Sequence, residues 1–207
     1  PKTYKVLSLA GADYIRVGIG FGGGCLTAMN TGIGYAMASL VLECRELKNK
    51  MYSEGENCAA IVADGGFREY SDIIKALALG ADYVMLGSIF NKALESCGDT
   101  VDEDGELINQ YSPNAKEYLR LGGKLYKKFR GMSTKEVQKA WGNSDLKTSE
   151  GVVRLNEVEY TLNGWVDNFR HYLKSAMSYT DSKNLSEFIG QVRYTLITQA
   201  SFARYNK

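Results

Sequence analysis

Three short apolar runs organise the first half of the chain, and glycine or an Asp-Gly-Gly turn follows each of them. The runs cover residues 12–18, 59–63 and 82–86. Their continuous apolar character, rich in β-branched side chains, is typical of buried strands. Each strand therefore ends in a polar or glycine-rich segment, and such segments at the carboxyl ends of parallel strands carry the chemistry of barrel enzymes.

Segments with apolar side chains at helical intervals lie before and between these predicted strands. A short helix is expected over residues 2–9, before the first strand, and residues 34–47 place apolar side chains at helical intervals. Residues 71–79 predict a third helix, with Ser71 as its N-cap and Gly80 as its stop. The alternation of strands and helices predicts an α/β fold with a parallel sheet, covered by helices on both faces.

The second half of the chain has weaker patterns. Residues 95–112 are acidic and polar and predict a surface loop or hairpin, whereas residues 116–130 interleave basic and aromatic side chains. That interleaving is compatible with nucleic-acid binding, but a solvated strand pair is the interpretation we favour. Alternating apolar residues over 152–160 predict a hairpin. Helical patterns over residues 165–176 and 185–189 predict two closing helices.

Composition narrows the functional classes. The chain has 207 residues with a formal net charge of +1, so no nucleic-acid partner is expected. No apolar run approaches the roughly 18 residues of a membrane span, and no membrane partner is expected. The four cysteines lack metal-like pairing, which favours reduced thiols and a cytoplasmic location. The single histidine, His171, lies in a helical pattern, so a Cys–His mechanism is disfavoured.

Candidate chemistry lies in the glycine-rich segment VGIGFGGGCLTAMNTGIG, residues 17–34. It sets Cys25 directly after a glycine run that follows the first strand. Glycine permits close approach of a ligand to the backbone, and the surrounding N–H groups suit a nucleophilic thiol. A flexible turn with an incidental cysteine is the alternative interpretation of this segment alone.

Several motifs in one order resemble the IMP dehydrogenase / GMP reductase family of (β/α)8 TIM barrels. They are GIGxGxxCxT at 18–27, TGxGY at 31–35, ADGG at 63–66, VMLGS at 84–88, GMS at 131–133 and SEG at 149–151. The resemblance implies that the chain carries the last three β/α units of one barrel domain, followed by a flap and tail over about 99–207. The N-terminal half of the barrel would then be absent from this sequence.

Within the family, several details resemble the reductases. They are Tyr35, the pair Glu43-Cys44, Glu95-Ser96 and the GMS motif. The resemblance implies an NADPH-dependent GMP reductase that converts GMP to IMP and ammonia through a covalent Cys25 thioimidate. Two alternatives stay open: an IMP dehydrogenase that oxidises IMP with NAD+, and a catalytically weak purine-nucleotide-binding subunit.

The resemblance also assigns roles to individual residues. Cys25 would be the nucleophile, with Thr27 and Glu150 moving the proton of the leaving amine. Lys147 and Ser149 would contact the cofactor, and the carbonyls of Gly20, Gly22 and Cys25 would hold a monovalent cation, K+. The residues expected to bind GMP or IMP are Gly23, Asp64, Gly65, Gly66, Gly87, Ser88, Met132, Ser133, Lys147 and Gly151.

Two positions depart from the family pattern. Gly23 stands where a phosphate-binding serine is usual, and Lys147 stands where reductases have an arginine. Lysine keeps the charge but lacks the planar fork of arginine. We therefore expect weaker GMP binding or a different ligand. The resemblance further implies a homotetramer, or a partner segment that supplies the N-terminal barrel strands.

Overall fold

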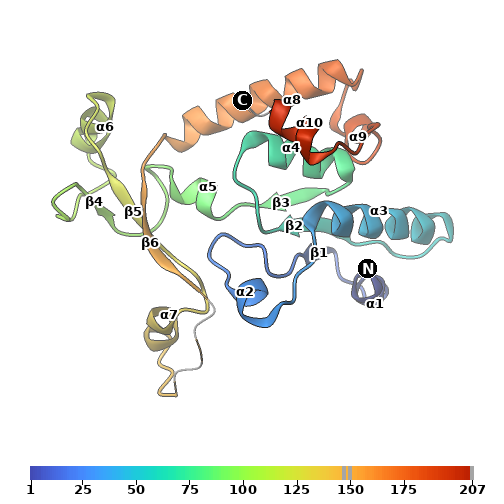
Figure 1. Cartoon of the computed structure of the whole chain (residues 1–207), viewed down its shortest axis with the longest axis horizontal. Coiled ribbons are helices and arrows are strands. Elements are labelled where there is room, and N and C mark those ends of the chain that lie inside the picture. Colours follow the sequence, from blue (N-terminus) through green and yellow to red (C-terminus); the bar gives the residue numbers. More distant parts are fainter. Residues whose placement is uncertain (146–147, 149–150, 206–207) are drawn as a thin grey trace.

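A parallel three-stranded sheet forms the centre of the computed structural model, which describes residues 1–145, 148 and 151–205 (Figure 1). Its strands β1 (Tyr14–Val17), β2 (Ala60–Asp64) and β3 (Tyr83–Met85) pair in that order. The sequence prediction of three parallel β-strands separated by helices is confirmed. Because the strands are parallel, their carboxyl ends, and the loops that follow them, lie at one edge of the sheet.

Three helices, one before β1 and one after each of β1 and β2, cover one face of this sheet. These are α1 (Lys2–Leu9), α3 (Met37–Ser53) and α4 (Tyr70–Leu79). Ile15 and Ile61 point into this layer, with exposed fractions of 6% and 0%, whereas Tyr14 and Tyr83 on the opposite face are 63% and 53% exposed. The expectation of helices on both faces is therefore wrong for the described residues. The runs are apolar on both sides, so their composition could not reveal which side is covered.

Two helix boundaries differ from the sequence expectation. The helix α4 is capped by Glu69 and not by Ser71, because Glu69 and Asp72 form a reciprocal capping box. The helix α3 begins at Met37 and continues to Ser53, six residues beyond the expected end at 47. Gly80 does end α4, in the left-handed conformation with φ 116° that glycine adopts readily.

A second, antiparallel sheet stands beside the first (Figure 1). It consists of β4 (Thr100–Val101), β5 (Tyr126–Arg130) and β6 (Val153–Glu157). Together β5 and β6 form the flap ribbon, as we call it below. The alternating pattern over 152–160 is a strand, β6, but the hairpin expected there is wrong, because the antiparallel partner of β6 is the distant β5. The expected strand pair over 116–130 is wrong, because α6 (Pro113–Arg120) begins there with Ser112 as its N-cap, and only β5 is a strand.

Lys127 on β5 is fully buried, with an exposed fraction of 0%. Its Nζ donates to the carbonyl oxygen of Ser96 at 2.8 Å and contacts the side-chain oxygen of Gln110. Burial lowers the pKa of this amine. The basic residues of this segment are therefore not all solvated, since one of them ties the start of the flap ribbon to the loop before β4.

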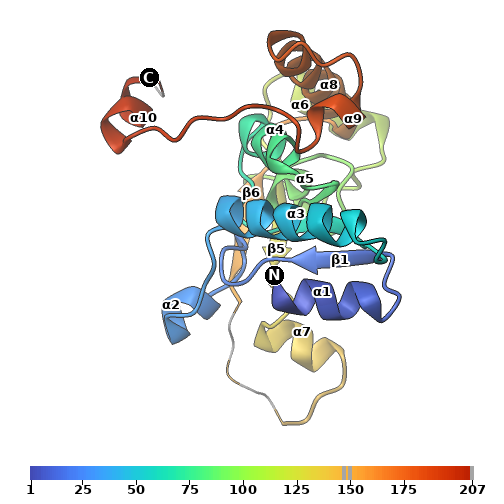
Figure 2. The same ribbon diagram turned by 90° about the vertical axis from the view of Figure 1, so that its right-hand side faces the viewer.

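The C-terminal helices complete the fold. The helix α8 (Leu162–Tyr179) packs on α4, with the ring of Trp165 stacked on Tyr70 at a centroid distance of 5.3 Å. Figure 2 shows α10 (Gln199–Tyr205) extending away from the body, beyond α9 (Leu185–Phe188). The predicted helices over 165–176 and 185–189 are confirmed. Among the described residues, no helix is long and apolar enough to cross a membrane.

Three short helices flank the loops at the edge of the sheet. The helix α2 (Thr27–Thr31) follows the glycine-rich loop, α5 (Ser88–Asn91) follows β3, and α7 (Lys135–Ala140) follows the GMS turn. The helices α2 and α5 begin at the last residue of a motif singled out in the sequence, and α7 begins two residues after one. These helices fix where the motif residues point.

Candidate functional site

Cys25 lies at the end of the loop that follows β1, directly before α2. Its main-chain N–H donates to the carbonyl oxygen of Gly22 at 2.9 Å, which closes the loop into a tight turn. Its Sγ lies 3.3 Å from the Oγ1 of Thr27. The thiol is half-buried, so it is held in place but reachable by a small ligand. The two residues expected to cooperate in catalysis are thus in direct contact.

The GMS turn and Gly151, the described residue of the SEG motif, converge on the same loop. Cys25 and Gly151 form an isolated antiparallel β-bridge, and the N–H of Gly131 donates to the carbonyl oxygen of Val152 at 2.9 Å. A Cβ atom added at Gly131 would lie 2.6 Å from the oxygen of Gly24. Three sequence motifs from distant parts of the chain therefore meet around Cys25.

The Asp-Gly-Gly turn after β2 packs against the glycine-rich loop. A Cβ atom at Gly65 would lie 3.1 Å from the main-chain nitrogen of Gly22. Gly18 has φ 144°, and a Cβ there would lie 2.0 Å from the oxygen of Asp64, so only glycine fits. The carboxylate of Asp64 lies 3.5 Å from the Nε of Arg16. Asp64, Gly65 and Gly66 thus line the same edge of the sheet as Cys25.

Gly87 and Ser88 follow β3 and complete this edge. The Oγ of Ser88 lies 3.4 Å from the point that a Cβ of Gly23 would occupy. Gly87 and Met132 both border a cavity of about 770 Å³, which Phe90 and Phe129 also line. Met132 is 67% exposed, and Ser133 beside it is exposed as well. Of the described candidate residues, Gly87 and Met132 therefore border this cavity, while Gly65 and Gly66 line a separate pocket beside α3 and α4.

Three of the expected site residues, Lys147, Ser149 and Glu150, lie outside the described residues. His171 is exposed on α8. Within the described ranges, no cluster of three or more His, Cys, Asp or Glu side chains could hold a metal ion. The four cysteines are free thiols, as the sequence predicts.

Tyr35 and Glu43, two of the details that resemble reductases, are bonded to each other. The phenol of Tyr35 lies 2.6 Å and 2.7 Å from the two oxygens of the Glu43 carboxylate. This hydrogen bond raises the pKa of Tyr35. The contact joins the segment after α2 to α3 and thereby supports the far end of the Cys25 loop.

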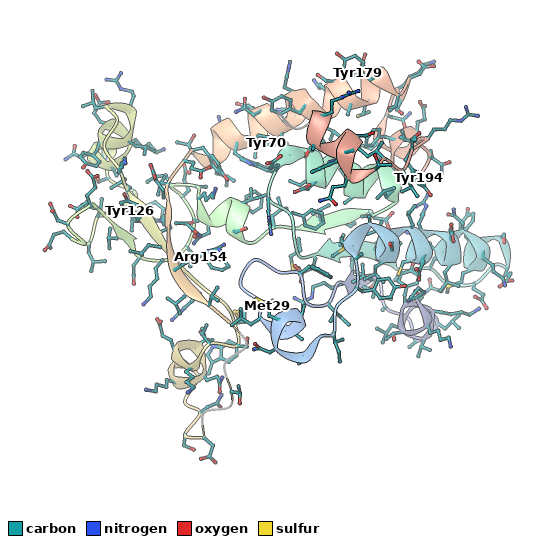
Figure 3. The ribbon with its side chains drawn as sticks, viewed as in Figure 1. Met29, Tyr70, Tyr126, Arg154, Tyr179 and Tyr194 are labelled. Carbon is teal, nitrogen blue, oxygen red and sulfur yellow. The ribbon has the colours of Figure 1, made fainter. Side chains whose placement is uncertain are left out.

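Sequence reasoning missed Phe129 and Arg154, which lie opposite each other in the flap ribbon. The Arg154 guanidinium lies over the Phe129 ring, 5.0 Å from its centroid. Figure 3 labels Arg154 between the ribbon and the loop that follows β1. Its Nη2 is 3.5 Å from the point that a Cβ of Gly23 would occupy. No local motif marks Arg154, because its place depends on the register of β5 and β6.

Comparisons with known proteins agree with this arrangement. A family model described as "IMP dehydrogenase / GMP reductase domain" matches residues 2–206. The chain is 32% identical to GMP reductase of Onchocerca volvulus over 201 residues, covering 96% of this chain and 49% of that protein. It is 33% identical to inosine-5'-monophosphate dehydrogenase of Chlorobaculum parvum over 207 residues, covering 97% of this chain and 38% of that protein.

A solved structure adds the fold. A variant of GMP reductase from Trypanosoma brucei in complex with guanosine 5'-monophosphate superposes with a TM-score of 0.78 at 27% identity, covering 100% of this chain and 38% of that one. The chain spans about half the length of the GMP reductases it matches. Its fold is accordingly part of an α/β TIM barrel, and the chain belongs to the IMP dehydrogenase / GMP reductase family of oxidoreductases.

Proposed function

We propose that this chain carries the catalytic loop of an NADPH-dependent GMP reductase, which converts GMP to IMP and ammonia. The observation that carries the proposal is the contact of the Cys25 Sγ with the Thr27 hydroxyl, 3.3 Å apart, beside the GMS turn. A thiol is a good nucleophile and a good leaving group, as the two halves of this reaction require. The purine would lie over Cys25 with its base against Met132 and Ser133.

In the first half of the reaction, the Cys25 thiolate attacks C2 of the purine and forms a C–S bond. The amine on C2 takes up a proton and leaves as ammonia, which produces a covalent thioimidate. Thr27 is the relay for that proton, because its hydroxyl touches the attacking sulfur. Glu150 is proposed as the carboxylate that supplies it.

In the second half, Cys25 would be released as the C–S bond breaks and IMP forms; bound NADPH would supply the hydride for C2. The cavity of about 770 Å³ beside Gly87 and Met132 fits a second ligand next to the purine, since ligand pockets have this size. Its lining includes Phe90 and Phe129, apolar surfaces suited to a planar ring. Lys147 and Ser149 are proposed as further cofactor contacts.

The other proposed contacts to the nucleotide come from turns at the carboxyl edge of the parallel sheet. Asp64 would accept hydrogen bonds from the ribose hydroxyls, and the turns Gly65-Gly66 and Gly87-Ser88 would face the phosphate. Gly151 would border the base. A K+ ion is proposed at the carbonyls of Gly20, Gly22 and Cys25. The donor type fits, since K+ prefers neutral carbonyl oxygens. The Gly22 oxygen already accepts one hydrogen bond, from the Cys25 N–H, and keeps a second lone pair.

For the assembly, we propose that residues 1–207 are the C-terminal part of one barrel domain, with the flap and tail over about 99–207. The open face of the central sheet, with Tyr14 and Tyr83 exposed, supports completion by further barrel strands. Those strands belong either to a longer protein or to a partner segment, and a homotetramer of such barrels is the assembly that the resemblance implies. A cytoplasmic location stays a prediction.

The assay that tests the proposal follows NADPH absorbance with GMP in the complete assembly. NADPH loss that depends on GMP and releases ammonia is expected. Cys25→Ala should abolish turnover but keep GMP binding, because the thiol forms a bond that binding does not need. Activity only with IMP and NAD+ would assign a dehydrogenase. GMP binding without turnover in either assay would assign a catalytically weak binding subunit.

A further inference from the structure

The absent side chain of Gly23 leaves a small space beside the Cys25 loop. A Cβ atom placed there would lie 3.4 Å from the Oγ of Ser88 and 3.5 Å from the Nη2 of Arg154. A hydroxyl from α5 and a guanidinium from β6 therefore border the same space. Both are donors, and together they suit an anion.

The Arg154 side chain is held in this place by its neighbours. It lies over the Phe129 ring at 5.0 Å, directly across the strand pair. The ring itself abuts the loop, because a Cβ atom at Gly24 would lie 2.8 Å from its Cε1. A guanidinium stacked on a ring keeps its N–H edge available. With the guanidinium in this place, its Nη2 lies on the side of the loop, beside Gly23.

The other cations of the flap ribbon are already neutralised or buried. Lys128 and Arg130 pair with Glu136 at 2.9 Å and 3.1 Å, and Lys127 is fully buried. Arg154 forms no ion pair with any carboxylate in the described part of the chain. Among the described cations of the flap ribbon, Arg154 is therefore the one that lies beside the loop without a carboxylate partner.

We propose that Arg154 binds the 5′-phosphate of the nucleotide beside Gly23, where no side chain stands between the guanidinium and the Ser88 hydroxyl. This inference rests on the proposed function, since it assumes a purine mononucleotide with its base over Cys25. A guanidinium can hold two phosphate oxygens at once. The charge of Arg154 thus takes over from the hydroxyl that position 23 lacks, and the Ser88 hydroxyl provides a third donor. The chain would then select nucleoside monophosphates over nucleosides.

Calorimetric binding of GMP and of guanosine to the complete assembly tests the inference. The variants are Arg154→Gln, Arg154→Lys and, as a matched control on the same ribbon, Arg130→Gln. Arg154→Gln should bind GMP about 10- to 100-fold more weakly than the wild type, because it loses charge-assisted hydrogen bonds to the phosphate. Its affinity for guanosine should be unchanged. Arg154→Lys should lie between, and Arg130→Gln should match the wild type. Thermal unfolding of each variant verifies the fold.

A second variant tests the space itself. Gly23→Ser in the Arg154→Gln background should recover part of the GMP affinity, because a serine hydroxyl can enter the space beside Ser88. Unchanged GMP affinity in Arg154→Gln, or an equal loss for GMP and guanosine, would overturn the inference while leaving GMP binding intact. If the wild type binds neither ligand, the proposed function fails, and this inference fails with it.

Discussion

The main chains of Cys25 and Gly151 pair in an antiparallel β-bridge. The Cys25 loop after β1 is therefore supported by the segment that leads into β6 of the flap ribbon and not by its own sheet alone. Gly131 lies between them, since a Cβ there would be 2.6 Å from the oxygen of Gly24 and 3.0 Å from the Cα of Gly151. Both neighbours are backbone atoms and cannot move aside easily.

Gly131→Ala is expected to push the flap ribbon away from the Cys25 loop and to lower turnover at least tenfold. A control is Gly122→Ala, whose Cβ would meet nothing within 4 Å, although its φ of 88° disfavours alanine. It should lose about 1 kcal/mol of unfolding free energy and retain activity. Steady-state rates and denaturant unfolding measure both. Equal activity of the two variants would contradict the role given to Gly131.

Alkylation should distinguish the four thiols by exposure. Cys97 is exposed, Cys25 and Cys58 are half-buried, and Cys44 is fully buried. Burial also raises the pKa of Cys44, which reduces its reactive thiolate. Iodoacetamide under native conditions should modify Cys97 and Cys25 but not Cys44, and GMP should protect Cys25 and not Cys97. Mass spectrometry of the digested protein reads each site. Protection of Cys97 in place of Cys25 would move the ligand away from the loop.

Tyr4 should make the fold sensitive to alkaline pH. Its side chain is 2% exposed and donates to the Ala59 oxygen, and burial raises its pKa to about 12. The folded state therefore holds this proton more tightly than the unfolded chain, and the stabilisation is complete below pH 10 and lost as pH rises toward 12. Relative to Tyr4→Phe, the wild type should lose about 2 kcal/mol between pH 8 and pH 11.5.

Urea unfolding at the two pH values measures this difference. Tyr179→Phe is the matched control, because that ring is 91% exposed and its replacement should leave the pH profile of the wild type unchanged. A wild type and a Tyr4→Phe variant that fall in parallel would show that Tyr4 does not carry the effect.

Lys127 should have the opposite effect to Tyr4 on the pH dependence of stability. Burial lowers its pKa, so the folded state releases this proton before the unfolded chain does, and stability rises as pH approaches the ordinary lysine value of 10.5. Lys127→Met should remove that rise. It should cost no more than about 1 kcal/mol at pH 7, because Ser96 and Gln110 keep other donors, the Gln110 amide and the Thr100 hydroxyl.

Lys127→Ala should lose about 3 kcal/mol, since it also leaves a cavity. Chemical unfolding at pH 7 separates the two variants, and unfolding of the wild type and Lys127→Met at pH 7 and pH 9.5 measures the pH-dependent rise. A methionine variant as unstable as the alanine variant would mean that the charge, and not the packing of the long side chain, holds the loop before β4.

The sequence predicted the central sheet well, because continuous apolar runs ended by glycine leave few alternatives to a buried parallel strand. It also predicted that the glycine-rich and Asp-Gly-Gly loops lie at one edge of the sheet, since carboxyl ends of parallel strands share an edge; that these loops carry the chemistry stays a prediction. The cap of α4 was wrong because the capping box of Glu69 and Asp72 outweighs the local preference of Ser71. The helix α6 was missed although the Ser112-Pro113 pair is a helix-start signal, because the basic and aromatic residues after it suggested strands.

Features that depend on pairing between distant segments of the chain could not be predicted from the sequence pattern. The burial of Lys127 follows from the loop that closes over β5, and nothing in the local sequence marks it. The position of Arg154 follows from the register that sets it opposite Phe129. A shift of that register by one residue would turn Arg154 to the other face of the ribbon. The site was therefore predictable where it depends on motifs and not where it depends on register.

The bridge between Cys25 and Gly151 also bears on the order of events during synthesis. The two residues are separated by most of the chain, and contacts between such distant segments form late, because a long loop must close first. Cys25 leaves the ribosome well before Gly151 and gains this support only after the flap ribbon has been made. A nascent or truncated chain would accordingly display an ordinary surface thiol, and the specific reactivity would arise only at the last stage of folding.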